Sequence, residues 1–416
     1  MRTLNQHNRV NSEQAAKNKG EMSELMFVCS DLLVGGTERQ LVELACALSR
    51  GGWPVSVYSV AGAGPLQTSL ERAGVSVILP PLNRPPVGTS LIKRAAAVIA
   101  AAPHLLVSML RRRPAIVHFM LPEAYLVGAP LAKIAHIPVK IMSRRSLNLY
   151  QRSSLVKRME RWLHRSMDAV LGNSLSVIRQ LKEEGVPASR LGLIYNGIDL
   201  QAFSGLDPRL PVRTSLSIKP NTLVLCMVAN LIPYKGHEDL IDALAIAAQK
   251  ISQDWHLLLA GRDDGIGARL KHKTIQLGLQ SHVSFLGSRT DIPALLAASD
   301  LGVLCSHQES FANAILEGMA AGLPMVVTNV GDNSEAVVDG ETGIVVPAKD
   351  PCRLAEAIVQ LARDPSMRSA YGTAGRRRVV ERLGMARCIA LHELLYRKLL
   401  TGEMPGKIPE LQPSQL

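Results

Sequence analysis

Short runs of β-branched and aliphatic residues alternate with longer helical patterns along almost the whole chain, and this alternation occurs twice. The strand candidates of the first series are Leu25–Cys29, Val55–Val60, Val75–Leu79, Ile116–Phe119, Lys140–Ser143, Ala169–Gly172 and Leu191–Ile194. Those of the second series are Leu223–Val228, His256–Ala260, Val283–Leu286, Leu301–Leu304, Met325–Val327 and Gly343–Val346. Apolar strands separated by helices are typical of parallel sheets covered on both faces. We therefore expect an α/β protein of two facing, Rossmann-like, doubly wound domains, with a ligand at the carboxyl ends of the strands.

The boundary between the two series is marked by turn-forming residues. Asn196-Gly197 is a turn signal, and prolines interrupt regular structure as far as Pro220. We place the hinge near residues 200–215. The expected parts are a polar tail (1–20), a first domain (21–205), a second domain (206–385) and a C-terminal helix and tail (386–416).

The composition is that of a globular protein. The chain has 416 residues, of which 47% are hydrophobic, enough for two domains and too many for a disordered chain. Its six cysteines form no Cys-x-x-Cys pair, which argues against a zinc site or a disulfide framework. No apolar run is long enough to span a bilayer, and the first twenty residues lack the apolar stretch of a secretory signal. These features predict a reduced, cytoplasmic protein.

Positive charge is concentrated in the first half of the chain. Residues 1–205 hold 25 basic and 13 acidic residues, whereas the remainder holds 22 of each, so the whole net charge of +12 lies in the first half. Such a half is suited to an anionic partner. Because no helix-turn-helix, zinc-finger or RRM signal accompanies the charge, we expect an anionic membrane or lipid phosphate and no nucleic acid.

Several basic residues could provide that contact. Arg144 and Arg145 follow a strand, and a basic amphipathic helix is expected between Leu155 and Met167. The basic residues of this helix are Lys157, Arg158, Arg161 and Arg165. The alternative, at least as good, is an ordinary solvated face over a packed stripe of Leu155, Met159, Trp162 and Leu163. Residues Ala95–Leu110 are apolar but too short for a membrane span, which indicates a packed helix or an interfacial hairpin.

The strongest local signal is a pair of glutamates around a predicted helix start. Glu309 and Glu317 are separated by seven residues, and Ser310 is a good N-cap for a helix that would be almost wholly apolar and buried. The spacing would put the two carboxylates about 12 Å apart along a helix. A helix N-terminus between them could bind a diphosphate, while the carboxylates bind sugar hydroxyls. The alternative, at even odds, is a capping carboxylate and a structural glutamate.

Other candidate residues follow strands of either series. Lys235 stands at a predicted helix start, where a bound polyphosphate would offset its repulsion from the helix dipole; by itself it would more commonly be an exposed loop lysine. Gly35 and Gly36 join a strand to a helix, so their backbone could approach an anion, or they form only a flexible turn. His118 ends a strand, and from its placement alone a structural role is favoured about two to one over a functional one.

Together these motifs resemble the GT-B glycosyltransferases, specifically retaining glycosyltransferase family four. The resemblance covers about residues 24 to 385 and is most specific in the second half. The segments that carry it are the Glu309/Glu317 spacing, Ala229–Gly236, Ala260–Arg262, Phe285–Asp291, Ala321–Pro324, Val330–Glu335 and Tyr195–Asp199. Departures from the family pattern are Asn230 where Arg is common, Ser310-Phe311-Ala312 in place of Gly-Phe-Gly, and Asp332 where Gly is common.

The resemblance implies a role for each matched residue. Glu309 would hold the donor-sugar hydroxyls, Glu317 the ribose, and Lys235 the diphosphate, which the amides of Phe311, Ala312 and Asn313 would cradle. Gly35 and Gly36 would approach the phosphates from the first domain, and His118 would lie at the donor sugar. The further donor-binding candidates are Asn230, Ser310 and Arg289.

The resemblance implies transfer of a sugar, with retention, from a nucleoside-diphosphate sugar with uridine as base. The expected acceptor is lipid-linked or a polysaccharide, at the cytoplasmic membrane face. No Asp-x-Asp occurs in the chain, and no metal or other cofactor is expected. The alternatives are a sugar-nucleotide epimerase of the same architecture and an inactive nucleotide-sugar-binding subunit.

Overall fold

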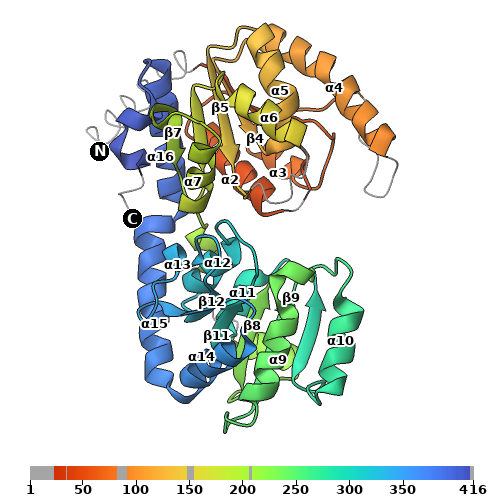
Figure 1. Ribbon diagram of the computed structural model, residues 1–416, viewed down its shortest axis with the longest axis vertical. Coiled ribbons are helices and arrows are strands. Elements are labelled where there is room, and N and C mark those ends of the chain that lie inside the picture. Colours follow the sequence, from red (N-terminus) through yellow and green to blue (C-terminus); the bar gives the residue numbers. More distant parts are fainter. Residues whose placement is uncertain (1–22, 34, 82–90, 148–153, 206–208, 413–416) are drawn as a thin grey trace, which may run out of the picture. The chain divides into compact units, whose positions relative to one another are not determined.

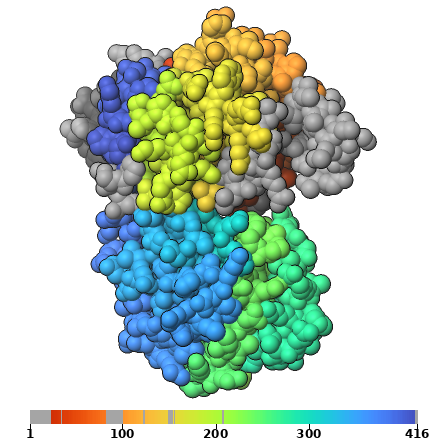
Figure 2. All heavy atoms as spheres, in the orientation of Figure 1, coloured from red at the N-terminus to blue at the C-terminus, as the bar shows by residue number. Residues whose placement is uncertain are grey.

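A computed structural model describes residues 23–33, 35–81, 91–147, 154–205 and 209–412, which fold into two compact units (Figures 1 and 2). Unit 1 comprises the chain up to Ile194 and again from Ile389, and unit 2 comprises Tyr195–Cys388. The first boundary therefore lies before Tyr195, upstream of the hinge expected at 200–215. Within the described residues, no helix has the length and apolar content needed to cross a bilayer.

Unit 1 contains a seven-stranded parallel sheet of order β3-β2-β1-β4-β5-β6-β7. The strands are β1 (Leu25–Cys29), β2 (Val55–Ser59), β3 (Ser76–Ile78), β4 (Ile116–Met120), β5 (Val139–Arg144), β6 (Ala169–Gly172) and β7 (Leu191–Leu193). Every residue of the adjacent central strands β1 and β4 is buried, because helices cover both faces of the sheet.

Unit 2 contains a six-stranded parallel sheet of order β10-β9-β8-β11-β12-β13. The strands are β8 (Leu223–Val228), β9 (Trp255–Ala260), β10 (Val283–Gly287), β11 (Leu301–Leu304), β12 (Met325–Thr328) and β13 (Gly343–Val346). All thirteen predicted strands of the two units are confirmed, and no end differs from its prediction by more than one residue.

Helices connect the parallel strands of both sheets (Figure 1). In unit 1 they are α2 (Gly36–Arg50), α3 (Gln67–Arg72), α4 (Leu91–Arg112), α5 (Pro122–Ile134), α6 (Ser154–His164) and α7 (Leu175–Glu183). In unit 2 they are α9 (His237–Ala247), α10 (Gly267–Gln276), α11 (Ile292–Ala297), α12 (Asn313–Ala320) and α13 (Asn333–Ala336). Helix α8 (Arg209–Ser215) precedes β8, and α14 (Pro351–Arg363) and α15 (Pro365–Arg378) follow β13. Helix α4 buries Leu105 and Met109, so the packed helix predicted for this segment, not the hairpin, is correct.

The strand order reverses once in each sheet. Successive strands add outward from β1 to β3 and then from β4 to β7, and in the same way from β8 to β10 and from β11 to β13. Right-handed crossovers place the helices of the two halves on opposite faces, which leaves a crevice at the carboxyl ends of the two strands where the order reverses. The switch points are β1/β4 in unit 1 and β8/β11 in unit 2.

The C-terminal segment, expected as a separate helix and tail (386–416), divides between the units. Helix α16 (Met385–Leu400) starts in unit 2 and belongs to unit 1 from Ile389. On unit 1 it is held by Trp53, whose Nε1 donates to Glu393 Oε1 at 3.0 Å and whose ring meets Tyr396 edge-on. The tail beyond α16 buries Leu411, so it is packed on the unit.

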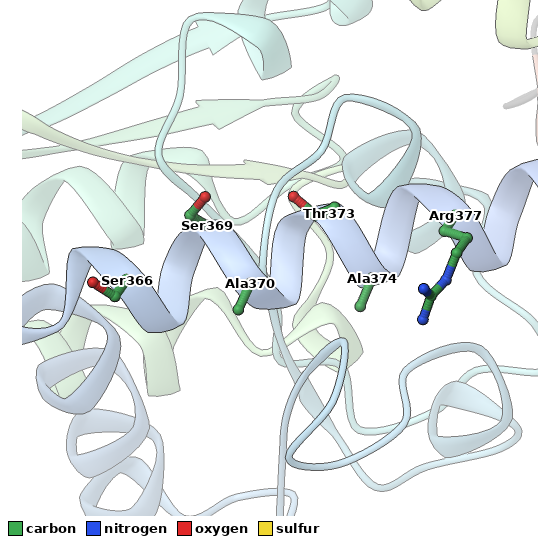
Figure 3. A pocket seen from close by; sticks show the side chains of 6 residues that line it. All are labelled: Ser366, Ser369, Ala370, Thr373, Ala374 and Arg377. Atoms are coloured by element: carbon green, nitrogen blue, oxygen red, sulfur yellow. The ribbon is translucent and has the colours of Figure 1, made fainter.

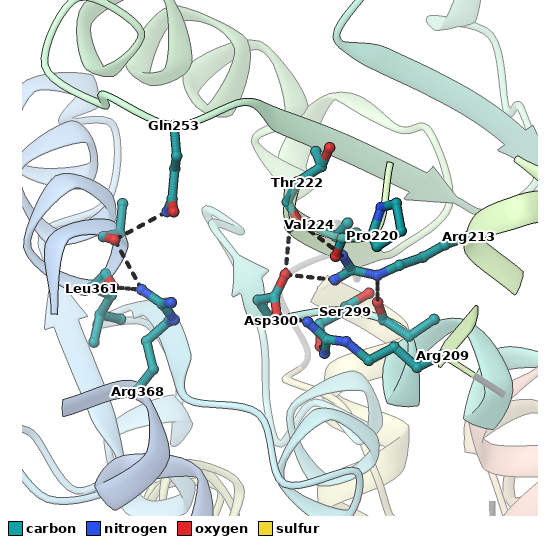
Figure 4. Close-up of polar contacts among 12 residues, drawn as sticks. Arg209, Arg213, Pro220, Thr222, Val224, Gln253, Ser299, Asp300, Leu361 and Arg368 are labelled. Carbon is teal, nitrogen blue, oxygen red and sulfur yellow. Dashed lines mark hydrogen bonds and ion pairs between the residues drawn. The ribbon is translucent and has the colours of Figure 1, made fainter. Parts of the chain in front are cut away.

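A buried arginine joins α8 to the sheet of unit 2 (Figure 4). Arg213 donates to Asp300 Oδ2 at 2.7 Å and to the carbonyls of Pro220, Thr222 and Ala298. Asp300 also accepts from the Val224 amide at 2.8 Å, so the pair fixes the starts of β8 and β11. A buried charge pair of this kind is costly to break because it leaves the other charge uncompensated.

We predict that Arg213→Met lowers the free energy of unfolding by about 3–5 kcal/mol, because Asp300 would keep only the exposed Arg209 and three carbonyls would lose their donor. Arg209→Met is the matched control, since Arg209 contacts the same carboxylate but its side chain is 48% exposed, and it should cost less than about 1 kcal/mol. Urea unfolding of the two variants measures the difference. Equal losses would show that Arg213 does not hold the unit together.

Candidate functional site

The predicted functional residues of unit 2 lie in loops that follow the carboxyl ends of its strands. Asn230 and Lys235 follow β8, Glu309 follows β11, and Arg289 follows β10. Because β8 and β11 are neighbours and mark the switch point, their loops meet at the edge of the sheet where parallel α/β sheets bind ligands.

Lys235 and Glu309 form the centre of this site. Lys235 Nζ lies 2.5 Å from Glu309 Oε1, and the same oxygen accepts a hydrogen bond from Ser306 Oγ at 2.7 Å. The side chains are 19% and 11% exposed, so the pair is reached by solvent at one side only. The structure thus brings together two predicted residues that are 74 positions apart in the chain. They form a cation beside an acceptor of hydroxyl hydrogen bonds, which is what a phosphorylated sugar requires.

Two glycines allow these loops to approach each other closely. Gly236 has φ +74°, and a Cβ there would lie 2.0 Å from the Cys305 carbonyl oxygen. Gly331 has φ +55°, and a Cβ there would lie 2.1 Å from the Glu309 carbonyl oxygen. A side chain at either position would push the loops apart and separate Lys235 from Glu309.

Further hydrogen bonds fix the β11 loop, and sequence reasoning missed the residues that make them. The His307 amide donates to the Tyr234 carbonyl at 2.7 Å, and His307 Nε2 lies 2.7 Å from Asp239 Oδ2. Thr328 Oγ1 donates to the Ser306 carbonyl at 2.6 Å. The available signal was position: Ser306 and His307 come directly after a strand that ends at the switch point.

The helix after Glu309 starts later than expected. Helix α12 begins at Asn313 with Ala312 as its N-cap, so Ser310 is not the cap, and Ala312 offers no side-chain hydrogen bond. Residues between Glu309 and Ala312 are therefore not helical, and the helical separation of about 12 Å expected between the two glutamates does not apply. Helix α12 is largely buried as predicted, but Glu317 itself is partly exposed.

Asn196 supports the start of α12. Its Nδ2 donates to Asn313 Oδ1 at 2.7 Å and contacts the Phe311 carbonyl at 3.4 Å. The neighbouring Tyr195 ring packs against Phe311 with centroids 4.8 Å apart. The first two residues of the Tyr195–Asp199 segment, noted only as part of a motif, therefore hold Phe311 and Asn313 in place.

Two other donor-binding candidates make contacts within their own loops. Asn230 Oδ1 accepts from the Arg262 amide at 3.1 Å, which ties the loop after β8 to the loop after β9. Arg289 pairs with Asp291 through two hydrogen bonds of 2.8 and 2.6 Å. These contacts give both residues a structural role, and their part in donor binding stays a prediction.

In unit 1, His118 lies inside the protein. Its Nδ1 is 2.8 Å from Tyr396 Oη and its Nε2 is 2.6 Å from Ser143 Oγ, and the residue is fully buried in β4. Burial first, and then the neighbouring His392 and Arg145, hold the pKa of His118 well below its ordinary value. Both ring nitrogens thus have protein partners, as the structural alternative requires, and the catalytic role stays a prediction.

Gly35 and Gly36 stand at the beginning of α2, after β1. Gly35 is the N-cap with extended backbone (φ −137°), and Gly36 is the first helical residue. A Cβ on Gly35 would lie 2.2 Å from Glu38 Oε2. A side chain at position 35 would therefore require the Glu38 side chain to move. The expected strand-to-helix turn is confirmed, and its approach to phosphates stays a prediction.

The basic residues proposed for a membrane or acceptor differ in their exposure. Lys157, Arg158, Arg161 and Arg165 are exposed. Arg144 is 1% exposed and pairs with Glu184 and Glu160, so the expectation that it reaches a ligand is wrong. Arg145 is partly buried, with Nη2 3.4 Å from Gln40 Oε1. Met159 and Trp162 are exposed, so the predicted packed stripe is also wrong for these two residues.

A surface hollow elsewhere in unit 2 holds none of the predicted residues. Its lining comes from one face of α15, namely Ser366, Ser369, Ala370, Thr373, Ala374 and Arg377 (Figure 3). Small side chains along one helix create this hollow, and we assign no function to it.

His237, beside Lys235, gives the site a measurable pH signature. Burial, together with the charge of Lys235, lowers the pKa of His237 to about 4. The unfolded chain binds a proton at this histidine below about pH 6.5, whereas the folded protein binds it only near pH 4, so stability falls as the pH falls through this window.

We predict that His237→Leu makes unfolding less sensitive to acid. The slope of the free energy of unfolding against pH between 6 and 4.5 should become shallower by about 1.4 kcal/mol per pH unit, because the variant has no proton to gain at this position. Urea unfolding at several pH values measures the slope. An unchanged slope would show that His237 binds its proton in the folded protein as readily as in the unfolded chain.

Two family models match the chain. Residues 211–378 match the family model described as glycosyl transferases group 1, and residues 34–202 match the model described as glycosyltransferase family 4.

Among curated proteins, the N-acetyl-alpha-D-glucosaminyl L-malate synthase of Bacillus anthracis is 29% identical over 58% of this chain and 62% of its own length. A D-inositol 3-phosphate glycosyltransferase of Corynebacterium diphtheriae is 34% identical over 39% of each chain. The lipopolysaccharide core biosynthesis mannosyltransferase LpsB of Rhizobium meliloti is 29% identical over 63% of this chain and 76% of its own length. The match spans less than two thirds of the first two proteins.

Solved structures share the fold. Anabaena Alr3699/HepE, in complex with UDP, has a TM-score of 0.78 and 23% identity over 90% of this chain and 100% of that chain. A glycosyltransferase from Rickettsia africae has a TM-score of 0.78 and 20% identity over 91% of this chain and 99% of that chain. The likeness establishes the GT-B fold of two Rossmann-like domains. The family 4 model over residues 34–202 and the group 1 model over residues 211–378 together cover most of the chain, so the protein belongs to the glycosyltransferases that these two models describe.

Proposed function

We propose that this protein transfers a sugar from a nucleoside-diphosphate sugar to a lipid-linked or polysaccharide acceptor, with retention of the anomeric configuration. The observation that carries the proposal is the Lys235–Glu309–Ser306 cluster at the β8/β11 switch point. At the carboxyl edge of a parallel sheet, the cation suits the diphosphate of a nucleotide sugar and the carboxylate suits its sugar hydroxyls.

The cluster suggests how donor binding proceeds. Lys235 is paired with Glu309. A diphosphate would compete for the ammonium, and Glu309, still held by Ser306, would then accept hydrogen bonds from the sugar hydroxyls. In this proposal Glu317 binds the ribose and the amides of Phe311, Ala312 and Asn313 bind the phosphates. Gly35, Gly36, His118, Asn230, Ser310 and Arg289 complete the proposed site.

The chemical demand is to stabilise a leaving diphosphate and an oxocarbenium-like sugar. A positioned cation meets the first part by electrostatic preorganisation, since charge develops on the diphosphate as the bond to the sugar breaks. Glu309, fixed by Ser306, would hold the sugar hydroxyls while the anomeric carbon becomes positive. We propose that this transfer needs no metal ion, which activity measured in excess EDTA tests.

The donor base and the acceptor are further proposals. The Anabaena structure with the same fold contains UDP, which favours a uridine donor. The Rhizobium relative is named for lipopolysaccharide core biosynthesis, which favours an acceptor in surface polysaccharide or glycolipid assembly. Such acceptors are found at membranes, so we place the reaction at the cytoplasmic face of the membrane.

We predict that Lys235→Ala and Glu309→Gln impair transfer in different ways. Lys235→Ala should weaken UDP binding and reduce kcat/KM by about 10²–10³, because it removes charge stabilisation from the leaving group. Glu309→Gln should leave UDP binding at least as tight as in the parent protein, because it frees Lys235, and should reduce kcat by about 10², because it removes a contact to the sugar. Calorimetry with UDP and a nucleoside diphosphate release assay measure both effects.

Lys219→Ala is the matched control for Lys235→Ala, since this lysine is 79% exposed and pairs with Asp254. It should bind UDP and turn over like the parent protein. If Lys235→Ala and Glu309→Gln kept full turnover, the assignment of the site would be wrong.

The two alternative functions give different results in simple assays. A sugar-nucleotide epimerase would change the donor with no acceptor present, which NMR of the donor alone detects. An inactive binding subunit would bind the donor and show no turnover over a broad panel of acceptors.

A further inference from the structure

Helix α6 of unit 1 turns two large apolar side chains outward among its exposed basic residues. Glu160 and His164 point inward and are buried together with Leu163. Trp162 is 58% exposed and Met159 is 42% exposed. A helix normally turns its large apolar residues to the core and its charged residues to water. Here a carboxylate occupies the inner face and a tryptophan the outer one.

A buried network holds the helix in this orientation. Arg144 Nη1 lies 2.7 Å from each carboxylate oxygen of Glu184, and its Nη2 lies 3.4 Å from Glu160 Oε2. His164 Nε2 is 3.1 Å from Glu184 Oε2, and His164 Nδ1 is 3.0 Å from Tyr125 Oη. These contacts tie α6 to β5, α5 and α7.

The orientation is costly for folding alone. Charged groups lose hydration when they are buried, and a buried ion pair is often no more stabilising than apolar residues of the same volume. Trp162 and Met159, which are 58% and 42% exposed, contribute little of the stabilisation that buried apolar surface gives. An outward tryptophan is therefore better explained by a partner outside the unit than by packing within it.

The charges around Trp162 indicate the chemistry of that partner. Arg158, Arg161 and Arg165 are exposed on the same helix and its C-terminal end. The exposed Lys133 of α5 places its ammonium 5.8 Å from the centroid of the Trp162 ring. The single acidic residue between 154 and 165 is the buried Glu160. The outer face is thus basic and apolar, with no carboxylate of its own helix to oppose an anion.

We infer that this outer face of α6, defined as Met159, Trp162, Arg158, Arg161 and Arg165, docks on an anionic lipid bilayer. Arginine side chains bind lipid phosphates, while tryptophan and methionine enter the boundary between headgroups and acyl chains. A soluble anion would satisfy the charges but not the apolar residues. The inference rests on the proposed function in that it names the surface for the membrane location. Atoms of this part of the chain, yellow in Figure 2, are visible on the surface of unit 1.

The tryptophan content of the chain allows a direct test. The chain contains three tryptophans, and Trp53 and Trp255 are 4% and 5% exposed. A change in fluorescence on lipid binding therefore reports Trp162. We expect a blue shift with vesicles of phosphatidylglycerol and phosphatidylcholine, quenching by brominated acyl chains, and neither effect with phosphatidylcholine alone. Binding should weaken as the salt concentration rises.

Variants separate the apolar and the charged contributions in a vesicle sedimentation assay. Trp162→Ala should lower the partition coefficient about five- to tenfold. Replacing both Arg158 and Arg161 by Glu should lower it by at least about 25-fold, since each basic residue contributes about fivefold. The matched controls are Ile275→Ala, at a 62% exposed position of unit 2, and the pair Arg376→Glu and Arg377→Glu on α15. Both controls should bind vesicles like the parent protein.

Several results would overturn the inference. One is equal vesicle binding by the two charge-reversal pairs. Another is Trp162 fluorescence that brominated lipids do not quench. A third is a change of oligomeric state in Trp162→Ala without a change in vesicle binding. The last result would mean that the face binds another protein. Turnover on a detergent-dispersed acceptor is measured in parallel. Turnover without vesicle binding refutes this inference alone, and vesicle binding without turnover refutes the proposed function alone.

Discussion

The arrangement of the candidate site depends on one constraint, the parallel direction of every strand in each sheet. Parallel strands end at a common edge, so the loops after β8 and β11 meet although Lys235 and Glu309 are 74 residues apart. The reversal of strand order between these two strands keeps helices from covering that edge. Gly236 and Gly331 then let the loops come close enough for a 2.5 Å ion pair.

The role of an ion pair in this protein depends on how deeply its cation is buried. Arg213 and Arg144 are 2% and 1% exposed, and their pairs with Asp300 and Glu184 fasten elements to the sheets. Lys235 is 19% exposed, so this cation can exchange Glu309 for an arriving anion. In the Arg144 network, burial raises the pKa of Glu184, but His164 and Arg144 outweigh it and hold the pKa below its ordinary value. That carboxylate therefore stays ionised and keeps α6 in place.

Most of the sheet architecture could be predicted because its signal is local. A run such as Leu223–Val228 is apolar throughout, and a strand buried on both faces needs no more than that. The loops that hold the candidate residues could also be predicted, because each of them follows a predicted strand. Ser306 and Asn196 were missed as supporting residues because their partners, Glu309 and Asn313, become neighbours only when loops fold back.

By itself, the sequence determined two parallel α/β units and the switch-point loops, because hydrophobic periodicity and turn residues act over short distances. It also proposed Lys235 and Glu309 as candidate residues in those loops. The tertiary structure decided the start of α12 at Asn313, the enclosure of His118 by Ser143 and Tyr396, and the return of α16 to unit 1. It also decided which face of α6 turns outward. Each of these depends on hydrogen bonds or ion pairs between residues far apart in the chain, and the energy of such a contact is absent from any local pattern.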